Sequence, residues 1–212
     1  MSDDPRPEGA NASAETVEWP VSLEGVTESV VTTLGPNGRW NAAALGLCGD
    51  DDDDDDDGDP GPVTAKTWGN TRTRRNFHRQ GGGYVQFTAD PVDFVDAALS
   101  IRELEEPVLE SANAWVRVRV EQVDSGIEGE TRWEEWQLHP LEAATVSETV
   151  PTIDRGFGAV IEATVAASRL GVEGYDDGEL RDRLEYCASV VDRAGSRRER
   201  DALERVREYS EW

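Results

Sequence analysis

The stretch from Thr71 to Asn76 carries side chains that could bind an anion. Thr71 and Thr73 offer hydroxyl groups, and Arg72 can add a charge-assisted hydrogen bond. The residue pattern predicts a helix from Thr71 to Gln80 with Thr71 as its N-cap. A helix N-terminus presents free backbone N–H groups and the positive end of the helix dipole. The stretch is therefore a candidate phosphate site.

The charge around this stretch is opposite to that of the whole chain. The 212 residues include 45 Asp and Glu but only 21 Lys and Arg, a formal net charge of −24. Between Asp59 and Asp90, however, there is no acidic residue. The same window holds five basic residues: Lys66, Arg72, Arg74, Arg75 and Arg79. Such a patch raises the local concentration of an anionic ligand. The residues leave an alternative open, a capped helix whose arginines pair with acidic neighbours.

Around the helix, period-2 patterns predict an antiparallel β domain. The pattern is clearest where Val116, Val118 and Val120 share one face while Arg117 and Arg119 take the other. The segments predicted as strands are 26–33, 39–47, 63–68, 84–88, 114–121, 131–138 and 141–150. A second short helix is predicted from residue 90 to residue 99, and an irregular acidic stretch over 102–110. These strands must position the helix that carries the candidate site.

The chain divides into three predicted parts. Residues 1–18 are expected to be a disordered acidic tail, 19–150 the β domain and 151–212 a helical region. The β domain contains an Asp-rich insertion at 50–61, which lacks the spaced ligands of a calcium loop and is predicted to be extended and solvated. In the helical region, an apolar stripe that includes Ile153 predicts the first helix, 177–194 the second, and a capping box of Ser196 and Glu199 the start of the third.

Composition limits the possible environments and partners. Lys66 is the only lysine, and an acidic, lysine-poor surface is typical of a halophilic protein; the alternative is an ordinary acidic protein from a GC-rich genome. The net charge excludes a general nucleic-acid or anionic-membrane surface. We expect a cytoplasmic protein, because no signal peptide or membrane span is recognisable. Cys48 and Cys187 show no metal or disulfide spacing.

Several motifs together resemble a known family. One motif is similar to the phosphate-binding stretch of flavin-reductase-like split barrels. It consists of Thr71-x-Thr73-x-x-Asn76-Phe77, followed by glycines, a strand and Asp90-Pro91. Residues 41–46, after a Gly-containing turn, resemble the strand that lines the flavin ring in those proteins. The tail over 153–170 resembles that of the archaeal domain of unknown function 447 family, which joins such a barrel to a C-terminal helical piece.

The resemblance implies an α+β fold, an antiparallel split β-barrel of the FMN-binding type followed by a C-terminal helical appendage. It implies bound FMN, with a deazaflavin coenzyme as the alternative, and a homodimer with flavin at the interface. A nicotinamide nucleotide or redox partner is a possible further ligand. The cofactor-binding residues carried over are Asn41, Ala42, Ala43, Lys66, Thr67, Trp68, Thr71, Arg72, Thr73 and Asn76.

Within this set the resemblance implies different roles. Thr71 and Thr73 would bind the phosphate, Asn76 would steady the loop or touch the phosphate, and Lys66 would reach it from the preceding strand. Residues 41–43 would present backbone to the isoalloxazine ring. Ala44 departs from the pattern, since related sequences often have proline there.

The expected function is FMN binding, with a flavin-dependent oxidoreductase or flavin reductase as one form of it. The alternatives are a non-enzymatic flavin carrier or sensor and a dimeric interaction module without a cofactor. No catalytic residue can be named. His78 and His139 are the only histidines, and the sequence shows no partner for either at ligand spacing; His78 is expected to be exposed. Arg155 and Glu162 are expected to contact a ligand or to form an ion pair between helix and barrel.

Overall fold

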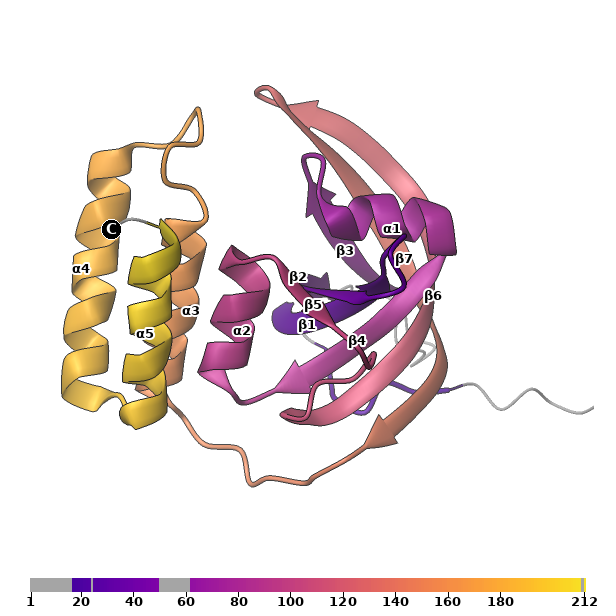
Figure 1. Cartoon of the computed structure of the whole chain (residues 1–212), viewed down its shortest axis with the longest axis horizontal. Coiled ribbons are helices and arrows are strands. Elements are labelled where there is room, and N and C mark those ends of the chain that lie inside the picture. Colours follow the sequence, from indigo (N-terminus) through magenta and orange to yellow (C-terminus); the bar gives the residue numbers. More distant parts are fainter. Residues whose placement is uncertain (1–16, 24, 50–61, 211) are drawn as a thin grey trace, which may run out of the picture.

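The structure is a computed structural model that describes residues 17–23, 25–49, 62–210 and 212. The aspartate-rich insertion at 50–61 and all but the last two residues of the predicted disordered tail lie outside the described residues. Figure 1 shows two neighbouring bodies, a β-barrel and a group of helices, with α2 between them.

Strands of the described chain form one antiparallel sheet that closes on itself. The strands are β1 (Val26–Leu34), β2 (Trp40–Cys48), β3 (Val63–Trp68), β4 (Gly82–Thr88), β5 (Arg102–Leu104), β6 (Ala112–Glu128) and β7 (Thr131–Thr145). Their order is β1-β4-β6-β7-β3-β2-β5, and β1 also pairs with β2. That last pairing closes six strands into a barrel and leaves β5 attached outside, to β2. The predicted fold class, an antiparallel split barrel followed by C-terminal helices, is confirmed.

Five helices accompany these strands in the described residues. They are α1 (Arg72–Gln80), α2 (Pro91–Leu99), α3 (Arg155–Ala167), α4 (Asp177–Ala194) and α5 (Arg197–Ser210). In Figure 1, α1 lies at one end of the barrel, while α3, α4 and α5 pack together beside α2. The predicted capping box is present at the start of α5, where the backbone N–H of Ser196 donates to Glu199 Oε2 at 2.6 Å.

The long hairpin of β6 and β7 differs from the prediction. A separate strand at 141–150 is wrong, because residues 141–145 continue β7 and pair with the beginning of β6. Bulges in the ladder, one of them between Arg117 and Val118, let the pairing continue past Pro140, which cannot donate a ladder hydrogen bond. The stretch 102–110, predicted to be irregular, begins with the short strand β5.

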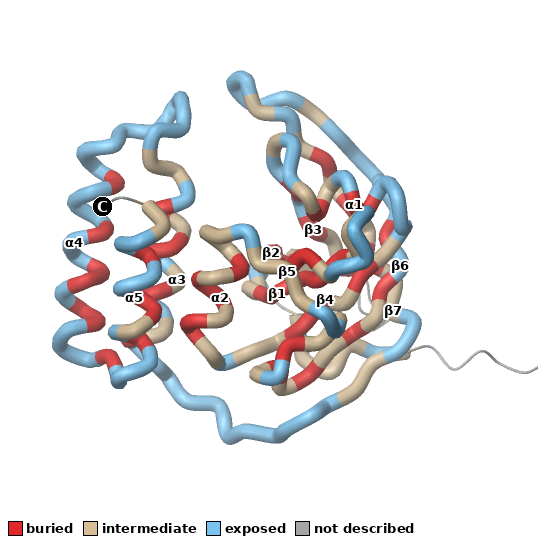
Figure 2. Tube along the Cα trace, in the orientation of Figure 1, coloured by how far each residue is buried: buried red, intermediate tan, exposed pale blue. Residues whose placement is uncertain are grey.

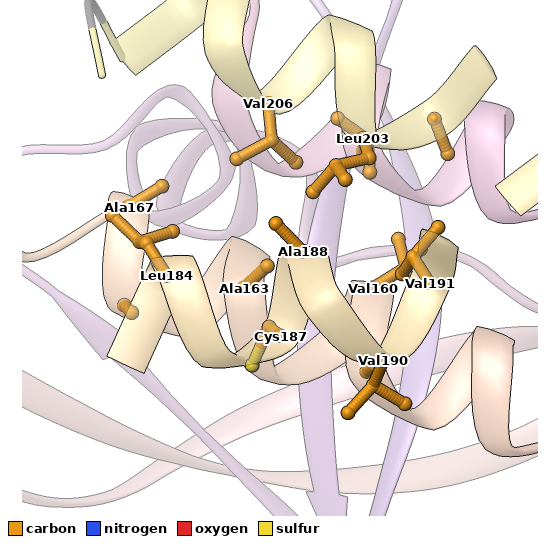
Figure 3. Close-up of a cluster of buried hydrophobic side chains, with 14 of the residues drawn as sticks. Val160, Ala163, Ala167, Leu184, Cys187, Ala188, Val190, Val191, Leu203 and Val206 are labelled. Carbon is orange, nitrogen blue, oxygen red and sulfur yellow. The ribbon is translucent and has the colours of Figure 1, made fainter. Parts of the chain in front are cut away.

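Two main apolar cores stabilise the two bodies (Figure 2). The barrel core includes Phe77, Leu47 and Trp136. The helical core joins α3, α4 and α5, and Figure 3 shows their side chains interlocking. Val92 and Val95 of α2 belong to this helical core, so α2 links the barrel to the C-terminal helices. Ile153, predicted to lie in the buried stripe of α3, is instead 99% exposed, because α3 begins two residues later.

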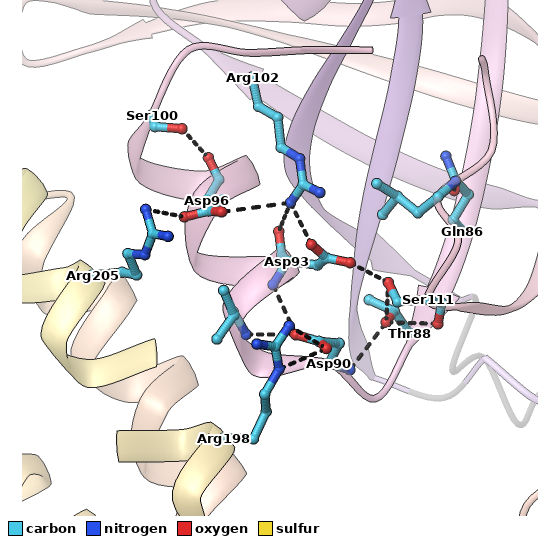
Figure 4. A network of polar contacts seen from close by, with 12 residues as sticks. Gln86, Thr88, Asp90, Asp93, Asp96, Ser100, Arg102, Ser111, Arg198 and Arg205 are labelled. Carbon is cyan, nitrogen blue, oxygen red and sulfur yellow. Dashed lines mark hydrogen bonds and ion pairs between the residues drawn. The ribbon is translucent and has the colours of Figure 1, made fainter. Parts of the chain in front are cut away.

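A charged network strengthens the contact between α2 and α5 (Figure 4). Arg198 lies 2.7 Å from Asp90, which also caps α2. Arg205 lies 3.9 Å from Asp96, whose carboxylate also accepts a hydrogen bond from Tyr209 at 3.0 Å. These partly buried pairs fix the register between the two helices.

The ion pair expected between the first C-terminal helix and the barrel is wrong. Glu162 of α3 pairs with Arg183 of α4, so it joins two helices of the same body. Within the described residues no ion pair involves Arg155.

Replacing Gly83 by alanine is expected to destabilise the barrel by about 1–3 kcal/mol, because small-to-large changes in a packed site force the surroundings to shift. A Cβ at Gly83 would lie 2.6 Å from the carbonyl oxygen of Thr32. Gly158→Ala is the matched control, since a Cβ at this position, the fourth residue of α3, meets nothing within 4 Å. Chemical denaturation should show that the control variant gains about 0.5–1 kcal/mol in free energy of unfolding. An equal change in the free energy of unfolding of both variants would contradict the close approach at Gly83.

Candidate functional site

Helix α1 begins and ends as its sequence predicts. Thr71 is the N-cap, and its Oγ1 accepts a hydrogen bond from the backbone N–H of Arg74 at 3.3 Å. Gly81 ends the helix in the left-handed conformation at φ 67°, and its N–H donates to Phe77 O at 2.8 Å. The face formed by Thr73, Asn76 and Phe77 is buried against the barrel. Phe77 meets Trp136 edge-on at 5.2 Å between ring centroids.

The amino-terminal end of α1 keeps polar groups without protein partners. The backbone amides of Arg72 and Thr73 make no hydrogen bond to any residue that the structure describes. The Thr73 side chain is 4% exposed, and within the same described ranges its hydroxyl also has no partner. The first N–H groups of a helix have no partner within the helix, so these donors are available to water or to a ligand. An anion suits these donors because the helix dipole is positive here.

Strand β1 brings another predicted site residue, Asn41, close to helix α1. Asn76 donates from Nδ2 to Thr33 Oγ1 at 2.8 Å, which ties α1 to the strand. Asn41 of β2 pairs with Thr33 in the β1–β2 ladder. The Asn41 side chain is 6% exposed, and its amide finds no hydrogen-bond partner in the part of the chain that is described. The structure therefore brings Asn41 and Asn76 together on either side of Thr33.

The basic residues of the charge-reversed window are largely engaged by the protein. Arg72 lies 2.7 Å from Glu103, and Lys66 lies 3.8 Å from Glu135. Arg75 donates to the carbonyl of Asn70 at 2.7 Å, which holds the turn before α1. The carboxylates come from β5 and β7, distant in the sequence. The alternative in which arginines pair with acidic residues thus describes Arg72, and it also describes Arg74, which pairs with Glu134. The donors that remain at the amino-terminal end of α1 are amides and hydroxyls.

Glu134 of β7 is the deepest acidic residue in the site, with no exposed side-chain area. Its carboxylate lies 2.5 Å from Arg74, 2.7 Å from His78 Nε2 and 3.1 Å from Arg132. The hydrogen bond from Arg74 lowers the pKa of Glu134 to about 2 although burial acts in the opposite direction, and His78 adds to the lowering. The sequence shows no partner for His78 at ligand spacing, and the structure supplies this carboxylate instead. The His78 side chain is half-exposed, and the partner comes from a strand 56 residues away.

Glu134→Gln is expected to lower the free energy of unfolding by about 1–3 kcal/mol at pH 7, since it removes charge-assisted hydrogen bonds. A carboxyl with a lowered pKa stabilises the fold above its unfolded pKa, near 4.5, and this contribution disappears as the pH falls toward about 2. The difference between wild type and variant should therefore be constant from pH 7 to 5 and shrink below pH 4.5. Urea unfolding at stepped pH measures it. A difference that stays constant down to pH 2.5 would contradict the lowered pKa.

The remaining predicted residues divide between two faces of the barrel wall. Lys66 and Trp68 lie exposed on the outer face, where the Lys66 ammonium stands 4.8 Å from the centre of the Trp133 ring. Thr67 points inward, accepts from Trp136 Nε1 at 2.9 Å and donates to Glu134 O at 3.4 Å. Adjacent strand residues face opposite sides, so the side chains of Lys66 and Thr67 point to different faces of the wall.

The predicted ring-lining strand, residues 41–46, is paired on one edge along its whole length and on the other edge only in part. Residues 41 and 42 of β2 pair with β1 on one side and with β5 on the other. Ala42 also packs into an apolar cluster beneath α2, while Ala43 packs against the barrel core. The backbone of residues 41 and 42 is therefore engaged by the sheet on both sides, whereas residues 43–46 pair with β1 alone within the described residues. The Asn41 side chain makes no hydrogen bond in the same ranges.

A cavity of about 610 Å³ lies at the opposite end of α1. It is lined by Gly81 and by the aromatic and basic side chains of Trp40, Tyr84, Arg117 and Arg119. Helix α1 is about 14 Å long at 1.5 Å per residue, so this cavity is distinct from the amino-terminal end of the helix. Periodicity places these side chains on outward-facing positions, but only the fold reveals the hollow.

Two other kinds of site are absent from the described residues. Their His, Cys, Asp and Glu side chains form no group of three that could hold a metal ion. Over the same ranges no helix is long and apolar enough to span a membrane.

The closed barrel with α1 across one end, followed by a helical bundle, defines a split-barrel protein of the flavin-reductase-like fold. The chain belongs to the DUF447 family. A model described as the N-terminal domain of a protein of unknown function (DUF447) matches residues 27–147, and a second DUF447 model matches residues 154–208.

Several solved structures are similar to this chain to different degrees. An FMN-bound DUF447 protein from Methanosarcina mazei is 23% identical and aligns over 88% of this chain and 95% of its own, with a TM-score of 0.70. Nitrilotriacetate monooxygenase component B from Bacillus cereus is 15% identical over 71% of this chain and 86% of its own, with a TM-score of 0.43. An FMN-binding protein from Thermus thermophilus is 13% identical over 68% and 82%, with a TM-score of 0.42.

Proposed function

We propose that this protein binds FMN, with the phosphate at the amino-terminal end of α1. The observation that carries the proposal is a group of donors there that make no hydrogen bond to any described residue, namely the Arg72 and Thr73 amides and the Thr73 hydroxyl. Membership of the DUF447 family and the likeness to the FMN-bound protein from Methanosarcina mazei support the choice of ligand.

The residues present fit such a ligand. Thr71, Arg72 and Thr73 would hold the phosphate, and Asn76 would keep α1 against β1 through its hydrogen bond to Thr33. The Asn41 amide, which makes no hydrogen bond among the described residues, would bond to the ligand beyond the phosphate. FMN supplies redox chemistry when bound, whereas the polypeptide binds it, orients it and excludes water. This division explains why no acid–base residue stands out in the sequence.

Titration of the purified protein with FMN in molar KCl tests the proposal. We expect the flavin absorbance bands to shift and flavin fluorescence to change with saturation, more strongly for FMN than for riboflavin, which lacks the phosphate. A deazaflavin coenzyme titrated in parallel separates the two cofactor classes. A protein that stays without flavin absorbance after incubation with FMN and gel filtration would contradict FMN binding and favour the interaction module.

Enzymatic turnover is a further step. If the protein is an oxidoreductase, steady-state oxidation of NADH or NADPH should depend on added FMN. Saturable FMN binding without turnover, tested with both nucleotides, would favour the carrier or sensor.

We also propose that the protein forms a homodimer with flavin near the interface. The wall of β6 and β7 lies on the side of the barrel away from α3–α5 (Figure 1) and exposes apolar side chains of Val123, Ile127 and Leu141. A second copy covering this wall would remove them from water. Light scattering at several concentrations distinguishes a monomer from a dimer.

The charge supports a cytoplasmic protein of a salt-accumulating cell. Screening of the −24 net charge should stabilise the fold, because the Debye length falls from about 10 Å at 0.1 M salt to about 3 Å at 1 M. We expect the thermal midpoint to rise between 0.1 M and 3 M KCl. A midpoint that is unchanged or falls would favour the ordinary acidic protein.

A further inference from the structure

Both oxygens of the buried Glu134 carboxylate are occupied by cationic or imidazole groups. Oε1 accepts from Arg74 and lies 3.1 Å from Arg132, and Oε2 lies 2.7 Å from His78 Nε2. Arg74 and His78 are four residues apart on α1, which places them on the same side of the helix, one turn from each other. Glu134 itself belongs to β7 and pairs with Thr67 of β3. One carboxylate therefore connects two points of α1 to the barrel wall.

Stability alone does not explain this arrangement. A buried ion pair stabilises a fold little more than a well-packed apolar pair does, because removing the charges from water is costly. The ion pair can, however, fix the orientation of the groups that it joins. The Nε of Arg74 is buried and has no partner among the described residues, so the hydrogen bond to Glu134 fixes the guanidinium. A helix of nine residues is marginal without tertiary contacts, and two anchors one turn apart restrict its rotation.

The rotation of α1 decides where its amino-terminal donors point. Thr73 precedes Arg74 directly, and the first free amides lie within one turn of it. In enzymes, a displacement of a positioned group by about 1 Å can lower the reaction rate about 100-fold. The position of these donors should matter to the affinity for phosphate in the same way. We propose that Glu134 is a positioning residue for the phosphate site, and that its ionised carboxylate holds the donors of α1 in the geometry that recognises phosphate. This inference rests on the proposed FMN binding.

The test compares FMN with riboflavin in wild type, Glu134→Gln and Glu142→Gln. Glu142 is the matched control, because it is also a β7 carboxylate paired with an arginine, Arg117 at 3.1 Å, but on the exposed face. The measured quantity is the ratio of the two dissociation constants, which isolates recognition of the phosphate. We expect Glu134→Gln to reduce the preference for FMN at least about tenfold, with riboflavin affinity within about twofold of wild type, since only the oriented donors change. Glu142→Gln should keep the wild-type ratio.

A second variant keeps the inference testable if Glu134→Gln does not fold. His78→Ala removes one of the two anchors at a half-exposed position and leaves Arg74 in place. It should reduce the preference for FMN in the same direction by a smaller factor, about threefold. A wild-type preference for FMN that survives unchanged in both variants would overturn the inference and leave the proposed function intact. Equal wild-type affinity for FMN and riboflavin would instead overturn the phosphate site itself.

Discussion

Replacing Thr71 and Thr73 together by alanine is expected to weaken FMN binding by about 2–4 kcal/mol, taking about 1–2 kcal/mol for each hydrogen bond to a charged phosphate. This corresponds to a rise of about 30- to 700-fold in the dissociation constant. Thr73 should contribute through its hydroxyl, which makes no hydrogen bond within the described residues although the residue is only 4% exposed. Isothermal titration calorimetry or fluorescence titration gives the constants, with riboflavin as the ligand that should be little affected.

Thr71 has a second role that the experiment must separate from binding. Its hydroxyl caps α1, and loss of an N-cap costs about 0.5–2 kcal/mol of stability. Thr71→Asp keeps a capping oxygen but places a negative charge at the helix end, so it should retain stability and still lose FMN affinity. Thr131→Ala, at the start of β7, serves as the control for an ordinary threonine. Unchanged FMN affinity in the Thr71 and Thr73 double variant would place the phosphate elsewhere.

Most of the barrel could be predicted because its signals are local. Alternating valines define β6, and Thr71 and Gly81 mark the two ends of α1. The length of the β6–β7 hairpin could not be predicted, because its distal half is exposed on both faces and loses the alternation. The continuation of β7 through Pro140 depends on bulges in its pairing with β6, and the sequence of one strand does not reveal such bulges.

The site was predictable only in part, for a related reason. A window of sequence can show that α1 is basic, but it cannot show that Glu103 and Glu134 fold back onto Arg72 and Arg74. The same non-local contact gives His78 its carboxylate. What the motif did locate is the amino-terminal end of α1, since capping and amide exposure are properties of neighbouring residues.

Leu184→Ala is expected to lower the free energy of unfolding by about 2–5 kcal/mol, the range for a fully buried leucine replaced by alanine. Leu184 of α4 has no exposed surface and lies in the core shared by α3, α4 and α5 (Figure 3). Its loss leaves a cavity among helices already packed through small side chains such as Ala163 and Ala188. Urea unfolding followed by circular dichroism measures the change. Tyr186→Ala, at a position 66% exposed on the same helix, should change stability by less than about 0.5 kcal/mol.

The same experiment reveals whether barrel and helices unfold together. Six of the seven tryptophans precede residue 137, so tryptophan fluorescence reports mainly on the barrel, whereas helical dichroism reports mainly on α3, α4 and α5. Val92 and Val95 of α2 lie in the helical core, and α2 is also held to β5 by Arg102, 2.6 Å from Asp93. Leu184→Ala should therefore shift both signals to the same lower urea midpoint. A barrel transition that stays at the wild-type midpoint while the helical signal moves would show that α2 does not couple the two bodies.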